Sequence, residues 1–174
     1  PQIKKLREHP ELGWISCLRS GSIRSLIDKG HLQRSLFDET NLAEIQSPDF
    51  PGERLIACLN PLLADERARK RQELLQATEK TLERLSREVS RRTKKPLGKA
   101  EIALKAGRIL GRYKMGKHFQ LTIEDGRFAW ARREEAIARE CALDGIYIVR
   151  TSQPESQLSA ADAVRKYKSL AVVE

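Results

Sequence analysis

The clearest alternation of hydrophobic and polar residues in this chain lies on either side of Asp125-Gly126. The apolar members of the pattern are Phe119, Leu121, Ile123, Phe128 and Trp130. Asp-Gly is a favoured two-residue loop of the type I′ hairpin turn. We therefore predict a β-hairpin over residues 118–131 with Ile123 facing Phe128, so that the large apolar side chains share one face.

Two stretches with the period of an α-helix precede this hairpin. A narrow apolar seam with spacings of 3, 4, 3 and 4 consists of Leu75, Thr78, Leu82, Leu85 and Val89. A second stretch places Ile102, Ala106, Ile109 and Tyr113 on one helical face, and a break at 93–98 separates the two. We predict an antiparallel helical hairpin over residues 61–113, in which each helix buries the seam of the other. Such a seam is also typical of coiled coils, so pairing in a homodimer is the alternative.

The flanking regions predict shorter elements. Helices are expected over 1–9, 22–30, 134–143 and from a capping Ser159 onward, and buried strands over 13–20, 53–59 and 146–149. The segment 31–51 contains several Asp, Asn, Ser and Pro residues and is expected to be irregular. The fold class predicted from these elements is a mixed α+β protein.

Composition excludes some classes of protein. Hydrophobic residues make up 40% of the chain and charged residues 33%. No apolar run approaches the roughly 20 residues that cross a bilayer, so we expect no membrane partner. Cys17, Cys58 and Cys141 are odd in number and far apart, which indicates free thiols and a reducing, cytoplasmic location.

The net charge of +9 is concentrated in the middle of the chain. Residues 61–117 contain 17 Lys and Arg against 7 Asp and Glu, whereas the remainder is close to neutral. Such a basic block can follow a phosphate backbone and gain affinity by releasing counterions. A solvated helical surface that is simply rich in Lys and Arg is the alternative interpretation.

Known site motifs are absent from the sequence: there is no Cys-x-x-Cys, His-Glu-x-x-His, Walker or Gly-x-Gly-x-x-Gly pattern. A tight basic strip follows the second predicted helix and consists of Arg108, Arg112, Lys114, Lys117 and His118. Contact with DNA phosphates is the functional interpretation of this strip. Side chains that extend from a helix end into solvent are the structural one.

The C-terminal segment Tyr167-Lys-Ser-Leu-Ala-Val-Val-Glu174 resembles the signature of bacterial insertion-sequence transposases of the DDE class, Tyr-x2-Arg-x3-Glu-x6-Lys. Tyr167 and Glu174 match at the right separation, and Leu170 occupies the arginine position. Segments 36–45, 47–55, 111–119 and 146–154 are similar to one subgroup of these enzymes in the same order.

The resemblance implies a ribonuclease-H-like core with two aspartates and one glutamate, here Glu174, as catalytic residue and metal ligand. The ions would be two Mg²⁺, with Mn²⁺ as an alternative, and both aspartates would lie upstream of this sequence. Tyr167 and Lys168 would contact DNA near the scissile phosphate. The implied domains are residues 1–20 and 145–174 as parts of the core, with 21–144 as the insertion that these enzymes carry.

The sequence thus predicts part of a DNA transposase that acts on double-stranded transposon ends and target DNA, by magnesium-dependent cleavage and strand transfer. A dimer would bring two ends together. This part alone is expected to be inactive, because one carboxylate cannot hold two metal ions. The alternative is a non-enzymatic module that binds nucleic acid or protein through the basic helical hairpin.

Overall fold

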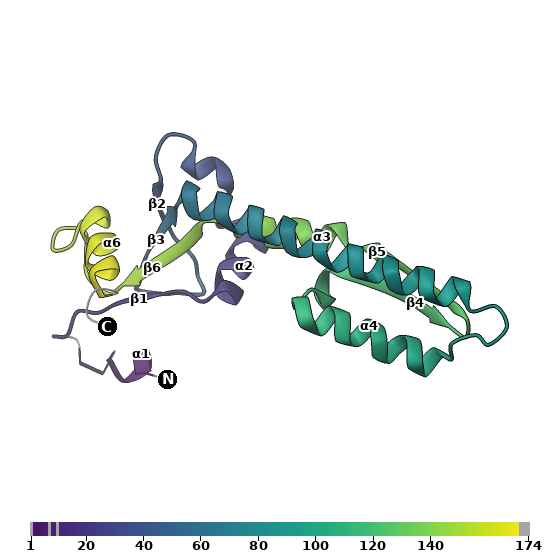
Figure 1. Cartoon of the computed structure of the whole chain (residues 1–174). Coiled ribbons are helices and arrows are strands. Elements are labelled where there is room, and N and C mark those ends of the chain that lie inside the picture. The colour runs from purple at the N-terminus through teal and green to yellow at the C-terminus, as the bar shows by residue number, and fades with distance from the viewer. Residues whose placement is uncertain (1, 7, 10, 171–174) are drawn as a thin grey trace. The chain divides into compact units, whose positions relative to one another are not determined.

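The computed structural model describes residues 2–6, 8–9 and 11–170, which form a mixed α+β protein with antiparallel sheets (Figure 1). The chain divides into two compact units. The first contains the described residues up to Ala64 and from Leu143 onward, and the second contains Asp65–Ala142. Within the described residues, no helix is long and apolar enough to cross a membrane.

The first unit is built on a four-stranded sheet with the strand order β1-β6-β3-β2, antiparallel throughout. Its strands are β1 (Ile15–Cys17), β2 (Leu42–Ile45), β3 (Arg54–Leu59) and β6 (Ile146–Thr151). Its helices are α1 (Gln2–Leu6), α2 (Ser20–Asp28), the 3₁₀ turn η1 (Arg34–Phe37) and α6 (Ala160–Ser169), and α3 (Pro61–Arg91) begins here.

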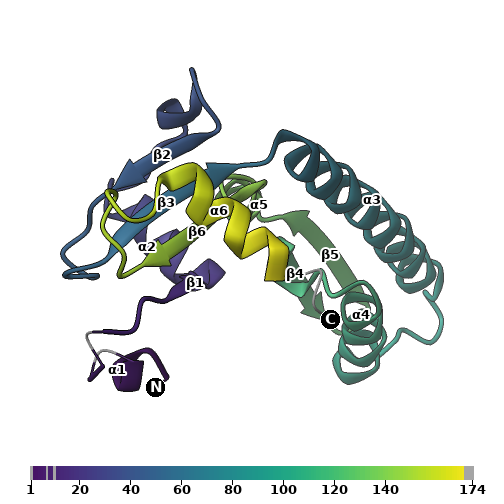
Figure 2. The ribbon, with the colours of Figure 1, turned by 90° about the vertical axis from the view of Figure 1, so that its left-hand side faces the viewer.

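Both faces of this sheet are covered, because β3 is apolar on both sides. Leu55 and Ala57 pack with α2 in one hydrophobic cluster, whereas Ile56 and Cys58 pack with α6 in another. Successive side chains of a strand point to opposite faces, so a continuous apolar run needs a cover on each side. Figure 2 shows the yellow α6 lying across the strands of the sheet.

The predicted strands at 53–59 and 146–149 are confirmed as β3 and β6, and the predicted 13–20 strand is confirmed over the shorter β1. The prediction that 31–51 is irregular is wrong in part, because β2 pairs with β3 from Leu42↔Cys58 to Ile45↔Leu55. A short edge strand gains its stability from its neighbour, so its own sequence carries little signal. The structure thus places residues up to Ala64, part of the expected insertion, in the same unit as β6.

The second unit contains most of α3, then α4 (Lys99–Tyr113), η2 (Gly116–His118), β4 (Phe119–Glu124), β5 (Arg127–Arg132) and α5 (Glu134–Cys141). The two long helices form the predicted antiparallel pair (Figure 1). Lys105 contacts Glu88 at 2.5 Å and Tyr113 lies 3.5 Å from Thr81, so sequence numbers rise along one helix as they fall along the other.

All members of the predicted seam are buried: Leu75, Thr78, Leu82, Leu85 and Val89. The four apolar members share one core with Ile102 and Ala106 of α4 and with Phe119 and Phe128 of the β-hairpin. The predicted hairpin register is also confirmed, with Ile123↔Phe128 and Glu124↔Arg127 among its pairs. The seam is therefore satisfied within the chain, by α4 and the hairpin together.

Candidate functional site

The structure places the site residues expected from sequence in both units. Tyr167 and Lys168 lie on α6 in the first unit, and Glu174 lies outside the described residues. The basic strip, from Arg108 to His118, lies in the second unit, in the last part of α4 and in the residues up to the end of η2. Each group is described by itself below.

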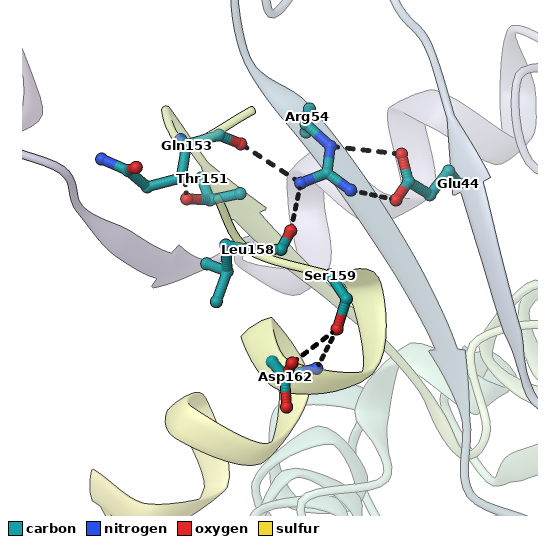
Figure 3. A network of polar contacts seen from close by, with 7 residues as sticks. All are labelled: Glu44, Arg54, Thr151, Gln153, Leu158, Ser159 and Asp162. Carbon is teal, nitrogen blue, oxygen red and sulfur yellow. Dashed lines mark hydrogen bonds and ion pairs between the residues drawn. The ribbon is translucent and has the colours of Figure 1, made fainter. Parts of the chain in front are cut away.

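The start of α6 is fixed by a side-chain cap. Ser159 Oγ accepts a hydrogen bond from the Asp162 backbone N–H at 3.1 Å and donates one to Asp162 Oδ2 at 2.8 Å (Figure 3). The cap satisfies one of the free N–H groups of the first helical turn, and the acidic side chain is favourable near a helix N-terminus. The predicted capping by Ser159 is confirmed.

The loop before α6 is held by a guanidinium from the centre of the sheet. Arg54, the first residue of β3, donates from Nη1 to the Leu158 carbonyl at 2.7 Å and to the Gln153 carbonyl at 3.2 Å (Figure 3). Its other edge forms a two-bond ion pair with Glu44 of β2. Charge-assisted bonds of this geometry are among the stronger hydrogen bonds in proteins. We call this arrangement the Arg54 clamp.

A second anchor joins the same loop to the N-terminal part of the unit. Thr151 Oγ1 donates to the Trp14 carbonyl at 2.7 Å and accepts from the Gln153 N–H at 3.1 Å, and the side chain is fully buried. Thr151 is the last residue of β6 and Trp14 immediately precedes β1, so the hydroxyl links the end of β6 to the start of β1. The route of the chain from β6 into α6 is thereby set at three points, by Thr151, Arg54 and Ser159.

Two segments that are far apart in the sequence lie side by side here. Segment 47–55 runs into β3 and segment 146–154 contains β6, and these strands pair from Arg54↔Thr151 to Leu59↔Ile146. Arg150 donates from Nε to Glu53 Oε2 at 2.6 Å, and its guanidinium lies 5.0 Å from the centre of the Phe50 ring. The two segments are thus held together by pairing, by an ion pair and by a cation–π contact.

An open hollow of about 870 Å³ lies between segment 44–54 and the loop at 152–155. Four charged residues lie on its wall: Glu44, Glu53, Arg54 and Glu155. The first three are engaged in ion pairs, Glu44 with Arg54 and Glu53 with Arg150. Glu155 is exposed to solvent.

Where α6 packs on the sheet, the hydroxyl of Tyr167 lies in one cluster with the Cys58 thiol of β3 and the Tyr147 hydroxyl of β6, and all three groups are neutral. The hydrogen bond between Tyr167 and Cys17, together with burial, raises the pKa of Tyr167. Burial raises the pKa of the Cys58 thiol to about 11, and burial beside Cys58 also raises the pKa of Tyr147. Protonated groups of this kind are poor nucleophiles and metal ligands. They serve to position α6 on the sheet rather than to react.

Lys168 follows Tyr167 on the same helix. It is exposed, and its ammonium is 5.9 Å from the centre of the Tyr147 ring. Its charge is therefore accessible to an anionic partner. The half-buried Tyr167 is held against the sheet through Cys17.

The basic strip of the second unit is only partly as expected. Arg112 and Lys114 are exposed, and Lys114 ends α4 in the left-handed conformation with φ 54°. Lys117 is exposed but forms an ion pair with Glu140 of α5. Burial would raise the pKa of the Glu140 carboxyl, but the Lys117 ammonium and the His118 ring together lower it.

The expectation that His118 belongs to this exposed strip is wrong. The side chain is 0% exposed, with Nε2 2.9 Å from Glu140 Oε2 and Nδ1 3.1 Å from the Met115 sulfur. A ring enclosed in this way does not reach a phosphate on the surface. His118 instead joins η2 to α5, and nothing in the local sequence distinguishes that role from a surface one.

Neither unit presents a metal centre among its described residues. Over residues 2–6, 8–9 and 11–170, no three His, Cys, Asp or Glu side chains lie close enough to hold an ion. The cysteines Cys17, Cys58 and Cys141 are free thiols, as predicted.

No protein-family model, curated protein or solved structure matches this chain.

Proposed function

We propose that this chain is part of a DNA transposase of the DDE class with a ribonuclease-H-like catalytic core. The complete enzyme would cleave phosphodiester bonds at the ends of a transposon and transfer the strands into target DNA. This chain would contribute the catalytic Glu174, together with a basic insertion. By itself it should not cleave DNA.

One observation carries the proposal: transposase-like segments 47–55 and 146–154, far apart in sequence, pair as β3 and β6 and jointly hold the start of α6. That helix contains Tyr167 of the transposase-like signature. Its firm anchoring suits a carrier of catalytic groups, since a displacement of about 1 Å can reduce a rate on the order of a hundredfold.

Side chains on α6 would contribute to substrate binding. The exposed Lys168 ammonium is suited to bind a DNA phosphate near the scissile bond. Tyr167, which is half-buried and bonded to Cys17, would keep the helix in register on the sheet.

Magnesium is the cofactor that the transposase resemblance implies, with Mn²⁺ as an alternative. The described residues by themselves do not form a magnesium site. Glu174 and two aspartates from chain upstream of this sequence would have to hold the two ions. Carboxylate oxygens are the ligands that Mg²⁺ prefers.

A second candidate function is a non-enzymatic module that binds nucleic acid or protein. The exposed basic residues of α3 and α4 favour it, because they form a charged surface on a unit with its own hydrophobic core. Duplex DNA is a partner under the transposase proposal, whereas the module would bind nucleic acid or protein. A cytoplasmic location agrees with the three free thiols. A homodimer remains a prediction of the transposase proposal.

The decisive experiment uses the complete protein that contains this chain. Glu174→Ala is expected to keep binding to transposon ends and to lose strand cleavage in Mg²⁺, because one leg of the metal site is removed. Glu155→Ala removes an exposed carboxylate before α6 and is the matched control. Cleavage by Glu174→Ala at nearly the wild-type rate would refute the transposase proposal and favour the module.

A further inference from the structure

Four basic residues of α3 form a stripe along one face of the helix: Lys80, Arg84, Arg87 and Arg91. All four are exposed, and their spacings of 4, 3 and 4 repeat those of the buried seam. Each lies two positions after a seam residue, and two residues turn an α-helix by about 200°. The basic stripe therefore faces away from the hydrophobic core of the second unit.

Most of the charge on the basic stripe is free to act on a partner. Among the described residues, Lys80, Arg84 and Arg91 form no ion pair, and Arg87 pairs only with the exposed Glu83 at 3.1 Å. Exposed pairs of this kind contribute little and are readily exchanged. A polyanion can thus bind the stripe without breaking a strong internal contact.

A second carboxylate beside the stripe, that of Glu88, is paired with a lysine of α4. Glu88 Oε1 lies 2.5 Å from Lys105 Nζ and 3.5 Å from an Arg92 nitrogen. Its negative charge is therefore compensated within the unit. It does not oppose an anion on the stripe.

The arginines also enclose a shallow hollow of about 410 Å³, lined by Arg84, Arg87, Glu88, Arg91 and Arg92. A guanidinium presents a planar fork of N–H donors that matches the oxygens of a phosphate. Several such groups on one straight helix suit a row of phosphates better than a single small anion.

The length of the stripe fits a DNA backbone. Eleven residues of helix rise by roughly 16 Å. Phosphates of one strand recur about every 3.4 Å along the duplex axis, so the stripe spans about five of them. The exposed large hydrophobic residues of the described chain are all leucines, so no exposed aromatic ring offers a stacking platform for unpaired bases.

We propose that the basic stripe is a binding surface for the sugar-phosphate backbone of duplex DNA, independent of base sequence. This inference rests on the proposed function in that the substrate is DNA. It involves neither Glu174 nor a metal ion. The stripe would bind duplex DNA that flanks the cleavage site, while the catalytic core acts at another position on the same DNA molecule.

The test measures binding of this chain to a fluorescein-labelled duplex of arbitrary sequence, by anisotropy in EDTA over about 50–200 mM salt. Replacing all four stripe residues with Gln is expected to make the slope of log K against log salt shallower by roughly 3 to 4, near 0.9 per lost contact. Affinity near 100 mM salt should fall at least about a hundredfold. Circular dichroism checks that the exposed substitutions leave the helices intact.

A matched control removes the same charge elsewhere, by Gln at four other exposed arginines: Arg24, Arg34, Arg133 and Arg139. Its slope should change by less than about 1 if location rather than net charge matters. Equal losses in the two variants would overturn the proposal. The proposal would also be overturned if the wild-type chain bound single-stranded DNA, or a polyglutamate peptide of equal charge, as tightly as duplex DNA.

The two proposals fail separately. DNA binding is measured without divalent metal. If Glu174→Ala leaves cleavage unchanged, the transposase proposal is refuted and the stripe proposal is not affected. If Glu174→Ala abolishes cleavage while the four stripe substitutions leave DNA binding unchanged, only the stripe proposal is refuted.

Discussion

Arg54 Nη1 lies 2.7 Å from the carbonyl oxygen of Leu158, the residue that precedes the N-cap of α6. A strand in the centre of the sheet therefore sets where a helix begins more than a hundred residues later in the chain. The contact uses a backbone acceptor, so it depends on the path of the loop and not on the side chain at 158.

Arg54→Met should destabilise the first unit by about 2 kcal/mol, because charge-assisted hydrogen bonds contribute about 1.5–3 kcal/mol. The methionine retains most of the aliphatic length and removes the donors to Leu158 and Gln153. Urea unfolding followed by Trp14 fluorescence in a Trp130→Phe background reports on this unit, since these are the two tryptophans of the chain.

Glu44→Gln is the matched control for Arg54→Met. It removes the charge of the partner and leaves both carbonyl contacts of Arg54 in place. We expect less than half the destabilisation, because the ion pair with Glu44 is partly exposed. Equal effects of the two substitutions would assign the stability to the ion pair and contradict the clamp.

Acid should weaken the second unit through Glu140. The Lys117 ammonium and the His118 ring outweigh burial and lower the pKa of the Glu140 carboxyl in the folded state. A lowered folded-state pKa contributes stability that is present above the unfolded value of about 4.3 and is lost as the pH falls through the folded value. The urea midpoint, followed by Trp130 in a Trp14→Phe background, should therefore drop as the pH falls below about 4.3.

Glu140→Gln should reduce this acid-dependent drop, because the amide does not titrate. Glu135→Gln, at an exposed glutamate of the same helix, should leave the drop as in wild type. A drop of the same size in Glu140→Gln would place the acid sensitivity in other groups.

Local patterns predicted the second unit well, for physical reasons. The Asp125-Gly126 turn and its alternating flanks specify their own register, and the seam from Leu75 to Val89 specifies its buried face. Interactions between neighbours in sequence dominate these elements. The stripe of Lys80, Arg84, Arg87 and Arg91 follows the same period two residues after the seam, but it was not predicted from the sequence.

Contacts between residues far apart in the chain could not be predicted from the sequence. β2 forms because it pairs with β3, and Arg54 contacts Leu158, which lies 104 residues later in the chain. His118 is buried because Glu140 approaches from a helix that follows the hairpin. Of the candidate site, sequence therefore predicted the capped helix with Tyr167 and Lys168, but not the clamp that holds it.

Glycine substitutions separate two kinds of backbone position. Gly145 has φ 74°, and a Cβ there would lie 2.5 Å from the Asn60 carbonyl oxygen and 2.8 Å from Ala64 Cβ. Gly145→Ala should cost the first unit more than about 1 kcal/mol, because the conformation is unfavourable for other residues and the neighbours are backbone and a short side chain.

Gly107→Ala should have the opposite sign. Gly107 lies exposed within α4, and a Cβ at this position would meet nothing within 4 Å. Alanine loses less conformational entropy than glycine in a helix, so the second unit should gain about 0.5–1 kcal/mol, measured by urea unfolding with Trp130 as reporter. Destabilisation by Gly107→Ala would mean that this face of α4 packs closely against a partner, which is the arrangement expected if the helical hairpin formed a homodimer through α4.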